Sequence, residues 1–145
     1  MLVAPAPPAP IGVTRELQEA LAHAYDNDET IDQSVDPVLT NGELSAEARR
    51  QVHEDSSRAG ETARMAWPRR ALLEDFTDRA GAINVPVLVL AGSGDKVDPP
   101  QIPREHLLPL IATATLTELG GTGHLSPLEV PDQIASDISA FVTRL

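Results

Sequence analysis

The sequence predicts an α/β protein with a short parallel sheet flanked by helices. Strand and helix patterns alternate from residue 83 onward, and this order is typical of a parallel sheet. Residues Val85–Ala91 form one continuous apolar run, as expected for a strand buried on both faces. The two strands predicted in this part of the chain end in glycine-rich turns that carry Asp95 and His124. Side chains at the carboxyl ends of parallel strands meet at one edge of the sheet, where ligands bind.

The first segment, residues 1–9, predicts only the stub of a strand and a proline-rich turn. Its first four residues are apolar, and the prolines from Pro5 onward cannot donate the hydrogen bonds of a sheet. Because natural chains usually begin outside a regular element, we expect this segment to enter the middle of a fold.

Residues 10–82 predict a second segment, which is helical, polar and irregular. Apolar residues recur at helical spacing after Thr14, and Ser45 stands where an N-cap would begin another helix. The residue before a proline avoids helical backbone angles, so Pro68 is expected to interrupt the third helix. The predicted helices of this segment are 14–25, 46–57 and 63–80.

The third segment, residues 83–145, predicts the α/β part of the chain. The helix between its two strands is disturbed by Pro103 and Pro109. The last helix carries a single apolar stripe and has Pro131 in its first turn. In order, the predicted elements are a strand at 85–91, a helix at 101–111, a strand at 113–119 and a helix at 131–145.

Composition and charge narrow the possible functions. The 145 residues include 22 Asp and Glu against 11 Lys and Arg, a formal charge of −11, so a nucleic acid would be repelled. No apolar run approaches the roughly 20 residues that span a bilayer, and the N-terminus does not resemble a secretory leader. We therefore expect a cytoplasmic protein with no membrane partner. The chain has no cysteine, which excludes thiolate metal sites and a cysteine nucleophile.

Asp95 and His124 are the candidate catalytic residues. Each follows a predicted strand on a loop whose glycines can adopt positive φ angles and so direct the side chain sharply. A carboxylate that holds an imidazole in one tautomer, and stabilises its protonated form, makes the other ring nitrogen a general base. Asp98 is an alternative acid, but the spacing Gly-x-x-Asp from Gly92 favours Asp95.

Other residues with chemical potential give weaker signals. Residues 26–30 resemble the start of a calcium loop, but Ile31 and Pro37 stand where that loop requires Gly and Glu. We therefore predict no metal site and no cofactor. Trp67 is a candidate for lining a pocket beneath the helical segment. Three histidines show no metal-ligand spacing and are expected on the surface: His23, His53 and His106.

Two motifs give the candidate residues a family context. The stretch Val85-Pro86-Val87-Leu88-Val89-Leu90-Ala91-Gly92-Ser93-Gly94-Asp95 resembles the strand and loop of the catalytic acid in the α/β-hydrolase family. Gly120-Gly121-Thr122-Gly123-His124-Leu125, followed by an amphipathic helix, resembles the family's histidine motif, and the order of acid before histidine also agrees. The resemblance covers residues 83–145. It implies a partial α/β-hydrolase fold with the last two or three strands, and with 10–82 as a helical lid.

The resemblance implies a hydrolase of small esters or lactones. In that family role, Asp95 would orient His124, which would act first as base and then as acid. The family's nucleophile lies in a G-x-S-x-G turn, which this sequence does not contain. We therefore expect the nucleophile upstream of Met1, and an isolated chain that is inactive as an enzyme. A small apolar ester would be the substrate if an upstream half completed the site.

Two other functions remain open at this point. One is a non-catalytic lid and scaffold module that binds a small apolar ligand or a partner chain, and the other is a gene product without function. A three-stranded remnant buries little apolar surface and leaves one strand edge unpaired. Exposed edges recruit other strands, so we expect self-association through this edge or completion by a partner chain.

Overall fold

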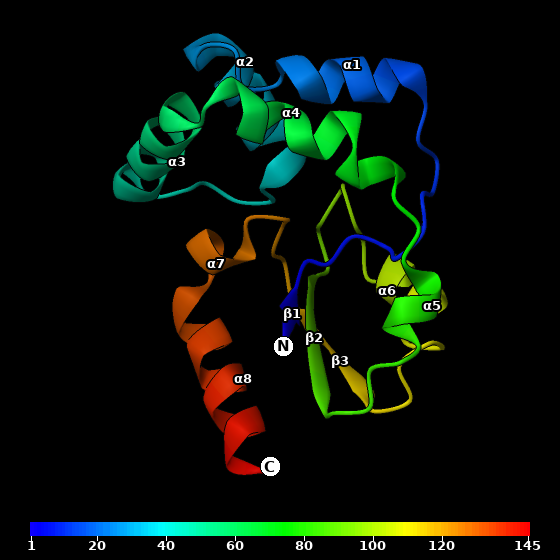
Figure 1. The fold of residues 1–145 in the computed structure, drawn as a ribbon. Helices are drawn as coiled ribbons and strands as arrows, with labels where there is room; N and C mark the ends of the chain where they lie inside the picture. Colours follow the sequence, from blue (N-terminus) through cyan, green and yellow to red (C-terminus); the bar gives the residue numbers. More distant parts are fainter.

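The computed structural model describes residues 1–145 and contains one three-stranded sheet. The strands are β1 (Leu2–Val3), β2 (Val87–Gly92) and β3 (Ala114–Leu119), all parallel and in the order β1-β2-β3 (Figure 1). Val89 of β2 lies opposite Leu2 of β1 and opposite Leu116 of β3. The prediction of a short parallel sheet is confirmed.

Helices surround this sheet (Figure 1). A helical layer, made of α1 to α4, lies beyond the carboxyl ends of the strands, while α8 covers one face of the sheet and α6 the other. No helix is both long and apolar enough to cross a membrane. The helices are α1 (Arg15–His23), α2 (Asp28–Ser34), the π-helix η1 (Val35–Leu39), α3 (Ala46–Arg58), α4 (Glu61–Arg69), the 3-10 helix η2 (Ala71–Leu73), α5 (Thr77–Ala80), α6 (Gln101–His106), α7 (Ser126–Glu129) and α8 (Pro131–Thr143).

Strand β2 is the centre of the core because both of its faces are covered. Alternate side chains of a strand point to opposite faces, so Val87 and Val89 join the cluster beside α6. Leu88 and Leu90 join the cluster beside α8. Every residue of β2 is buried, which explains the continuous apolar run in the sequence. The other buried members are Leu107 and Ile111 on the α6 side, and Leu119 and Ile134 on the α8 side.

A third hydrophobic cluster connects the helical layer to the loop after β3. Its buried members, Ile31, Val35 and Leu44, all come from the helical layer and its loops. Leu125 and Leu128, which follow this loop, pack against them. The segment that follows β3 is therefore held between the sheet and the helical layer.

The helical layer contains two helices that the sequence analysis does not assign, α2 and the π-helix η1 that directly follows it. Helix α2 begins inside the acidic stretch, where Asn27 and Thr30 form a capping box. The Thr30 N–H donates to Asn27 Oδ1 at 3.1 Å, and the Asn27 N–H donates to the Thr30 hydroxyl at 3.1 Å. These bonds satisfy backbone groups that a helix start leaves free, so a polar stretch becomes helical here rather than a calcium loop.

Two prolines lie where the predicted helices 63–80 and 101–111 are broken. Pro68 lies inside α4, which ends one residue later at Arg69. A proline so close to the end of a helix removes one backbone hydrogen bond and leaves the preceding turns intact. Helix α6 ends at His106 rather than at residue 111, and Pro109 lies in the turn that follows.

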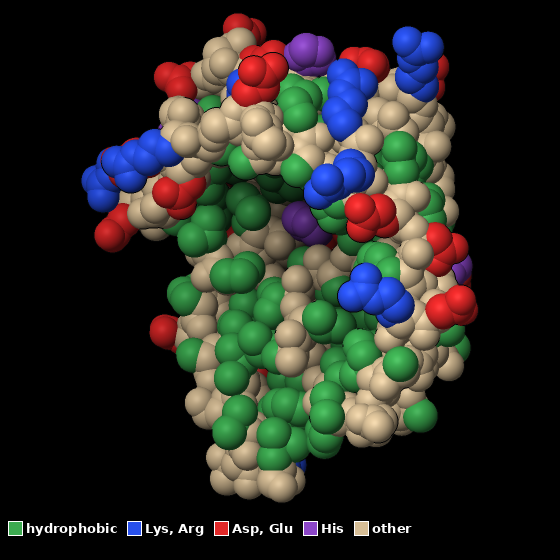
Figure 2. Space-filling view, in the orientation of Figure 1, with side chains coloured by type: hydrophobic (Ala, Val, Ile, Leu, Met, Phe, Trp, Pro, Cys, Tyr) green, Lys and Arg blue, Asp and Glu red, His purple; other side chains and the backbone are tan.

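The sheet has two edge strands, β1 and β3, and each pairs with β2 only. The backbone groups on the outer side of β1 therefore face no strand. Figure 2 shows hydrophobic side chains gathered on this side of the molecule, below the helical layer. The unpaired edge that the sequence predicts is therefore present. The exposed large apolar side chains of the chain include Met1, Phe76, Ile83 and Val142.

Gly92 ends β2 where the loop after β3 passes against it. A Cβ atom at Gly92 would lie 2.6 Å from the carbonyl oxygen of Gly123 and would overlap that of Thr122. We expect Gly92→Ala to lower the free energy of unfolding by about 1–3 kcal/mol, the usual cost of overpacking. Urea unfolding measures this loss. Gly42→Ala is the control, since a Cβ atom at Gly42 would meet no atom within 4 Å, and equal losses in both variants would contradict the close contact.

Candidate active site

The loops after β2 and β3 bring Asp95 and His124 together. His124 Nδ1 lies 2.9 Å from Asp95 Oδ2, within hydrogen-bond distance. The two residues are 29 positions apart in the chain, and they meet because parallel strands end at the same edge of a sheet. The two predicted site residues are therefore neighbours in space.

The carboxylate of Asp95 is held by its own loop. Its Oδ1 accepts the N–H of Val97 at 2.8 Å and the N–H of Asp98 at 3.0 Å. Its Oδ2 is left for His124, and the whole side chain is buried. Both carboxylate oxygens thus have partners, so the carboxylate cannot rotate without losing charge-assisted hydrogen bonds.

The loop that carries His124 is tied to the loop that carries Asp95. The N–H of Gly121 donates to Ser93 Oγ at 2.8 Å. The N–H of Gly94 donates to the carbonyl oxygen of Thr122 at 2.9 Å. Gly121 has a φ of +68°, a conformation that favours glycine. These bonds fix the separation of the two loops.

The pairing shifts the pKa values of both groups. Burial alone would raise the pKa of Asp95, but hydrogen bonds from His124 and from the loop backbone outweigh it and lower the pKa. Burial alone would lower the pKa of His124, but the hydrogen bond to Asp95 and the charges of Asp95 and Asp98 raise it above 6.5. Asp95 is therefore an ionised acceptor, so Nδ1 of His124 carries the proton and Nε2 is the basic nitrogen of the neutral ring.

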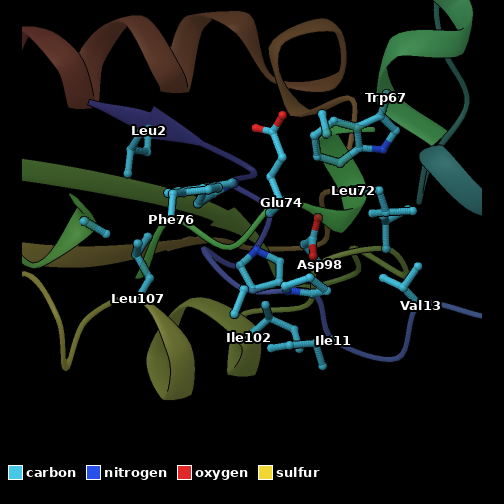
Figure 3. Close-up of a pocket in the computed structure, with 18 of the residues that line it drawn as sticks. Leu2, Ile11, Val13, Trp67, Leu72, Glu74, Phe76, Asp98, Ile102 and Leu107 are labelled. Carbon is cyan, nitrogen blue, oxygen red and sulfur yellow. The ribbon is translucent and has the colours of Figure 1, made fainter. Parts of the chain in front are cut away.

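Asp98, the alternative acid, has a different environment. Its side chain lines a neighbouring cavity (Figure 3), whereas Asp95 is the carboxylate that accepts the hydrogen bond of His124. Burial raises the pKa of Asp98 to about 6, opposed by the positive charge of His124 and supported by the negative charge of Asp95. Asp98 is thus a carboxyl group that titrates close to neutral pH beside the pair.

A largely apolar cavity opens beside the loop of Asp95. Its volume is about 940 Å³, and 18 of its 25 lining residues are hydrophobic, which is within the usual size range of ligand pockets. Trp67 and Phe76 line it together with Asp98 (Figure 3). Figure 2 shows a hollow between the helical layer and the sheet. Trp67, a candidate for this role in the sequence, therefore lies at the wall of a pocket.

The other histidines lie outside this site. His53 on α3 contacts Asp32 at 2.9 Å. His23 contacts Asp26 at 2.7 Å, and His106 approaches only Glu105, at 3.9 Å. No group of three or more His, Asp or Glu side chains could hold a metal ion. These histidines form side-chain pairs with nearby carboxylates.

Three serines are considered as possible nucleophiles, and none of their hydroxyl groups is hydrogen-bonded to His124. Ser45 caps α3 by accepting the N–H of Ala48, and Ser93 accepts the N–H of Gly121. Ser126 Oγ is buried without a hydrogen-bond partner.

Two further residues support the pair, and the sequence assigns this role to neither of them. The Glu129 carboxylate accepts the N–H of Gly123 at 2.9 Å. Asn41 Nδ2 donates to the carbonyl oxygen of Gly121 at 3.0 Å, across 80 positions of the chain. Glu129 follows the histidine motif closely, but the contact of Asn41 has no local signal in the sequence.

Asp98 offers a test of the electrostatics of this site. Its pKa is about 6 in the folded protein against an ordinary 3.8, so the folded state binds this proton more tightly than the unfolded chain does. The contribution of the Asp98 carboxyl group to the free energy of unfolding is fully present below pH 3.8. This contribution is lost as the pH rises through about 6. We expect Asp98→Asn to raise the free energy of unfolding by about 1–2 kcal/mol near pH 7.5, and by much less near pH 4.

Denaturant unfolding at the two pH values measures this difference. Asp78→Asn, which changes an exposed carboxyl group on α5, is the matched control and is expected to show no such pH-dependent gain. A gain of the same size at both pH values for Asp98→Asn would contradict the raised pKa.

Comparison with solved structures identifies the fold. The chain is similar to an esterase from Exiguobacterium antarcticum, with a TM-score of 0.84 and 20% identity. It is also similar to a bromoperoxidase from Bacillus anthracis, with a TM-score of 0.83 and 14% identity. A third similar structure is an α/β-hydrolase enzyme from a Medee basin deep-sea metagenome library, with a TM-score of 0.74 and 16% identity. No protein-family model matches the sequence, and no curated protein matches it significantly.

The extent of these alignments defines how much of the fold is present. They cover 97–98% of this chain but only 54–56% of the three similar structures, so the chain spans about half the length of the proteins it matches. At such identities the likeness concerns the fold and leaves the activity open. The chain therefore carries a part of the α/β-hydrolase fold, as the resemblance of its two strand-and-loop motifs predicts.

Proposed function

We propose that this chain supplies the acid and the base of an α/β-hydrolase that cleaves small apolar esters or lactones. The observation that carries the proposal is the 2.9 Å contact between His124 Nδ1 and the buried Asp95 carboxylate. The contact lies at the carboxyl edge of the sheet, and the residues after Asp95 (Lys96, Val97 and Asp98) line a cavity with 18 hydrophobic lining residues. One of the similar structures is an esterase, which agrees with this reaction class.

In the proposed reaction, His124 moves a proton twice. Nε2 of the neutral ring takes the proton of a hydroxyl nucleophile as the oxygen attacks the ester carbonyl. Asp95 keeps the other proton on Nδ1 and stabilises the imidazolium that forms. The imidazolium gives its proton to the alcohol oxygen as the ester C–O bond breaks, which leaves the acyl group on the nucleophile. Water then attacks this acyl group while Nε2 takes a proton from the water, and the imidazolium protonates the nucleophile oxygen as the carboxylic acid is released.

We also propose that the nucleophile belongs to a polypeptide segment that pairs with the open edge of β1. No serine of this sequence lies in a G-x-S-x-G turn, and the similar structures extend well beyond the aligned half. An unpaired strand edge with exposed apolar neighbours favours the addition of another strand. In this proposal the chain alone is inactive, and residues 10–82 form a lid over a small apolar substrate.

The origin of the nucleophile is tested on the DNA that precedes the Met1 codon. An in-frame sequence with a strand, a G-x-S-x-G turn and a helix would place the nucleophile on the same polypeptide. The extended protein is then expected to hydrolyse p-nitrophenyl butyrate. The absence of this motif, both from the upstream DNA and from every chain that co-purifies with this one, would contradict the proposal.

Substitution of His124 tests the base directly. In the form that hydrolyses esters, we expect His124→Ala to lower kcat by about 10²–10⁴-fold, the usual contribution of a positioned general base. The release of p-nitrophenol at saturating substrate measures this loss. His106→Ala changes a histidine on α6 outside the site and is the matched control. Equal rates for the parent and His124→Ala would remove His124 from the reaction.

The pH dependence of kcat/KM tests the role of Asp95. Only the neutral ring of His124 is a base, so the rate is expected to rise with pH through a pKa above the ordinary 6.5. Asp95→Asn removes the charge that raises this pKa, so the inflection should move to lower pH while the maximal rate falls. An inflection at the same pH in both proteins would show that Asp95 does not act on His124.

The cavity favours a second candidate function, in which the chain binds a small apolar ligand without cleaving it. Trp67 is the only tryptophan of the chain and lines the cavity, so its fluorescence reports on binding there. An uncleavable amide analogue of the ester is a suitable probe. Saturable binding of this probe, together with no ester hydrolysis by any form of the protein, would favour this function over the hydrolase.

A further inference from the structure

The loop that carries His124 is bound by a segment of the helical layer. One carboxylate makes the connection: Glu129 accepts the N–H of Gly123 at 2.9 Å with Oε1, and the N–H of Asn41 at 3.1 Å with Oε2. Glu129 is the last residue of α7, whereas Asn41 lies between η1 and α3, 88 positions earlier. The carboxylate thus joins the residue before His124 to the helical layer.

Two further hydrogen bonds run between the same segments. Asn41 Nδ2 donates to the carbonyl oxygen of Gly121 at 3.0 Å. The N–H of Leu125 donates to the carbonyl oxygen of Leu39 at 2.9 Å. Together with Glu129, these bonds hold the backbone on both sides of His124, so the ring cannot move away from Asp95 unless some of them break.

Asn41 also lies directly against the two loops of the pair. A Cβ atom at Gly94 would come within 2.5 Å of Asn41 Nδ2, and a Cβ atom at Gly123 would come within 2.7 Å of Asn41 N. Ordinary contacts are longer than 3.4 Å, so both glycines make room for this residue. Gly94 precedes Asp95 and Gly123 precedes His124, and Asn41 therefore touches the backbone next to each member of the pair.

Apolar packing fixes the segment around Asn41 from behind. Leu44 is a buried member of the cluster with Ile31 and Val35, and Leu39 packs against the same cluster. Leu125, directly after His124, packs there as well. The position of Asn41 is therefore set by the packing of the helical layer.

We propose that Asn41 and Glu129 are positioning residues that hold His124 in register with Asp95. Through these two residues, the placement of the helical layer sets the distance between the acid and the base. The positioning itself is a property of the folded chain. Its value for catalysis rests on the proposed hydrolase function.

If Asn41 and Glu129 had a purely structural role, their substitution would change only the free energy of unfolding. The hydrogen bond to Asp95 raises the pKa of His124, with Asp98 as the second carboxylate that acts on the ring. A loosened pair would therefore lower this pKa in a protein that is still folded. Asn41→Ala is the cleanest variant, because Asn41 is exposed and its removal changes no charge near the ring.

The experiment is an NMR titration of the ring Cε1–H signal of His124 in the full chain of 145 residues. The signal is assigned by its loss in His124→Gln. We expect the pKa of His124 to fall by about half a unit or more in Asn41→Ala and in Glu129→Ala. Glu129→Gln keeps one oxygen for the N–H of Gly123 and should show a smaller fall. The controls, Asn84→Ala and Glu43→Ala, change exposed side chains and should keep the parent value.

An unchanged pKa of His124 in folded Asn41→Ala would overturn the proposal. If Glu129→Ala does not fold, Asn41→Ala decides by itself, since it removes an exposed side chain. The titration requires no turnover, so the two proposals fail separately. Ester hydrolysis that survives in His124→Ala would end the proposed function and leave the positioning role standing.

Discussion

A carboxylate removed from water is the constraint on which this site depends. Burial of a charge costs several kcal/mol unless hydrogen bonds replace the lost water. Asp95 has such bonds on both oxygens, from two backbone N–H groups and from His124. Because each bond is needed, the loop fixes the place of the acid, and His124 has to be brought to it. The glycines of the two loops, and the polar contacts between them, are consequences of this requirement.

The sheet and the helical layer both position the pair of Asp95 and His124, but they support different members of it. Strand β2 is buried along its whole length and supports the acid loop from below. The histidine loop, by contrast, is held partly by bonds to Asn41 and Leu39, which belong to the helical layer and not to the sheet. The same layer contributes Trp67 to the wall of the cavity. The part of the chain that shapes the cavity is thus also the part that steadies the base.

The features that can be predicted from the sequence are those with a signal in a few neighbouring residues. The apolar run of β2, the apolar stripe of α8 and the glycine-flanked Asp95 and His124 each occupy a few neighbouring residues, and the structure places all of them as expected at the level of elements. Helix α2 is not predicted because its cap lies in an acidic stretch without apolar residues at helical spacing. The contacts of Asn41 are not predicted because its hydrogen-bond partners lie 80 and more positions away in the sequence. The raised pKa of Asp98 depends on burial beside two other ionisable groups, which only the folded chain reveals.

The tautomer of His124 tests the pairing with Asp95 most directly. The ¹⁵N chemical shifts of the two ring nitrogens, measured in the labelled full chain at a pH where the ring is neutral, show which nitrogen carries the proton. An ionised Asp95 at 2.9 Å predicts a proton fixed on Nδ1 and a bare Nε2. A proton on Nε2, or the averaged shifts of a free histidine, would contradict the account.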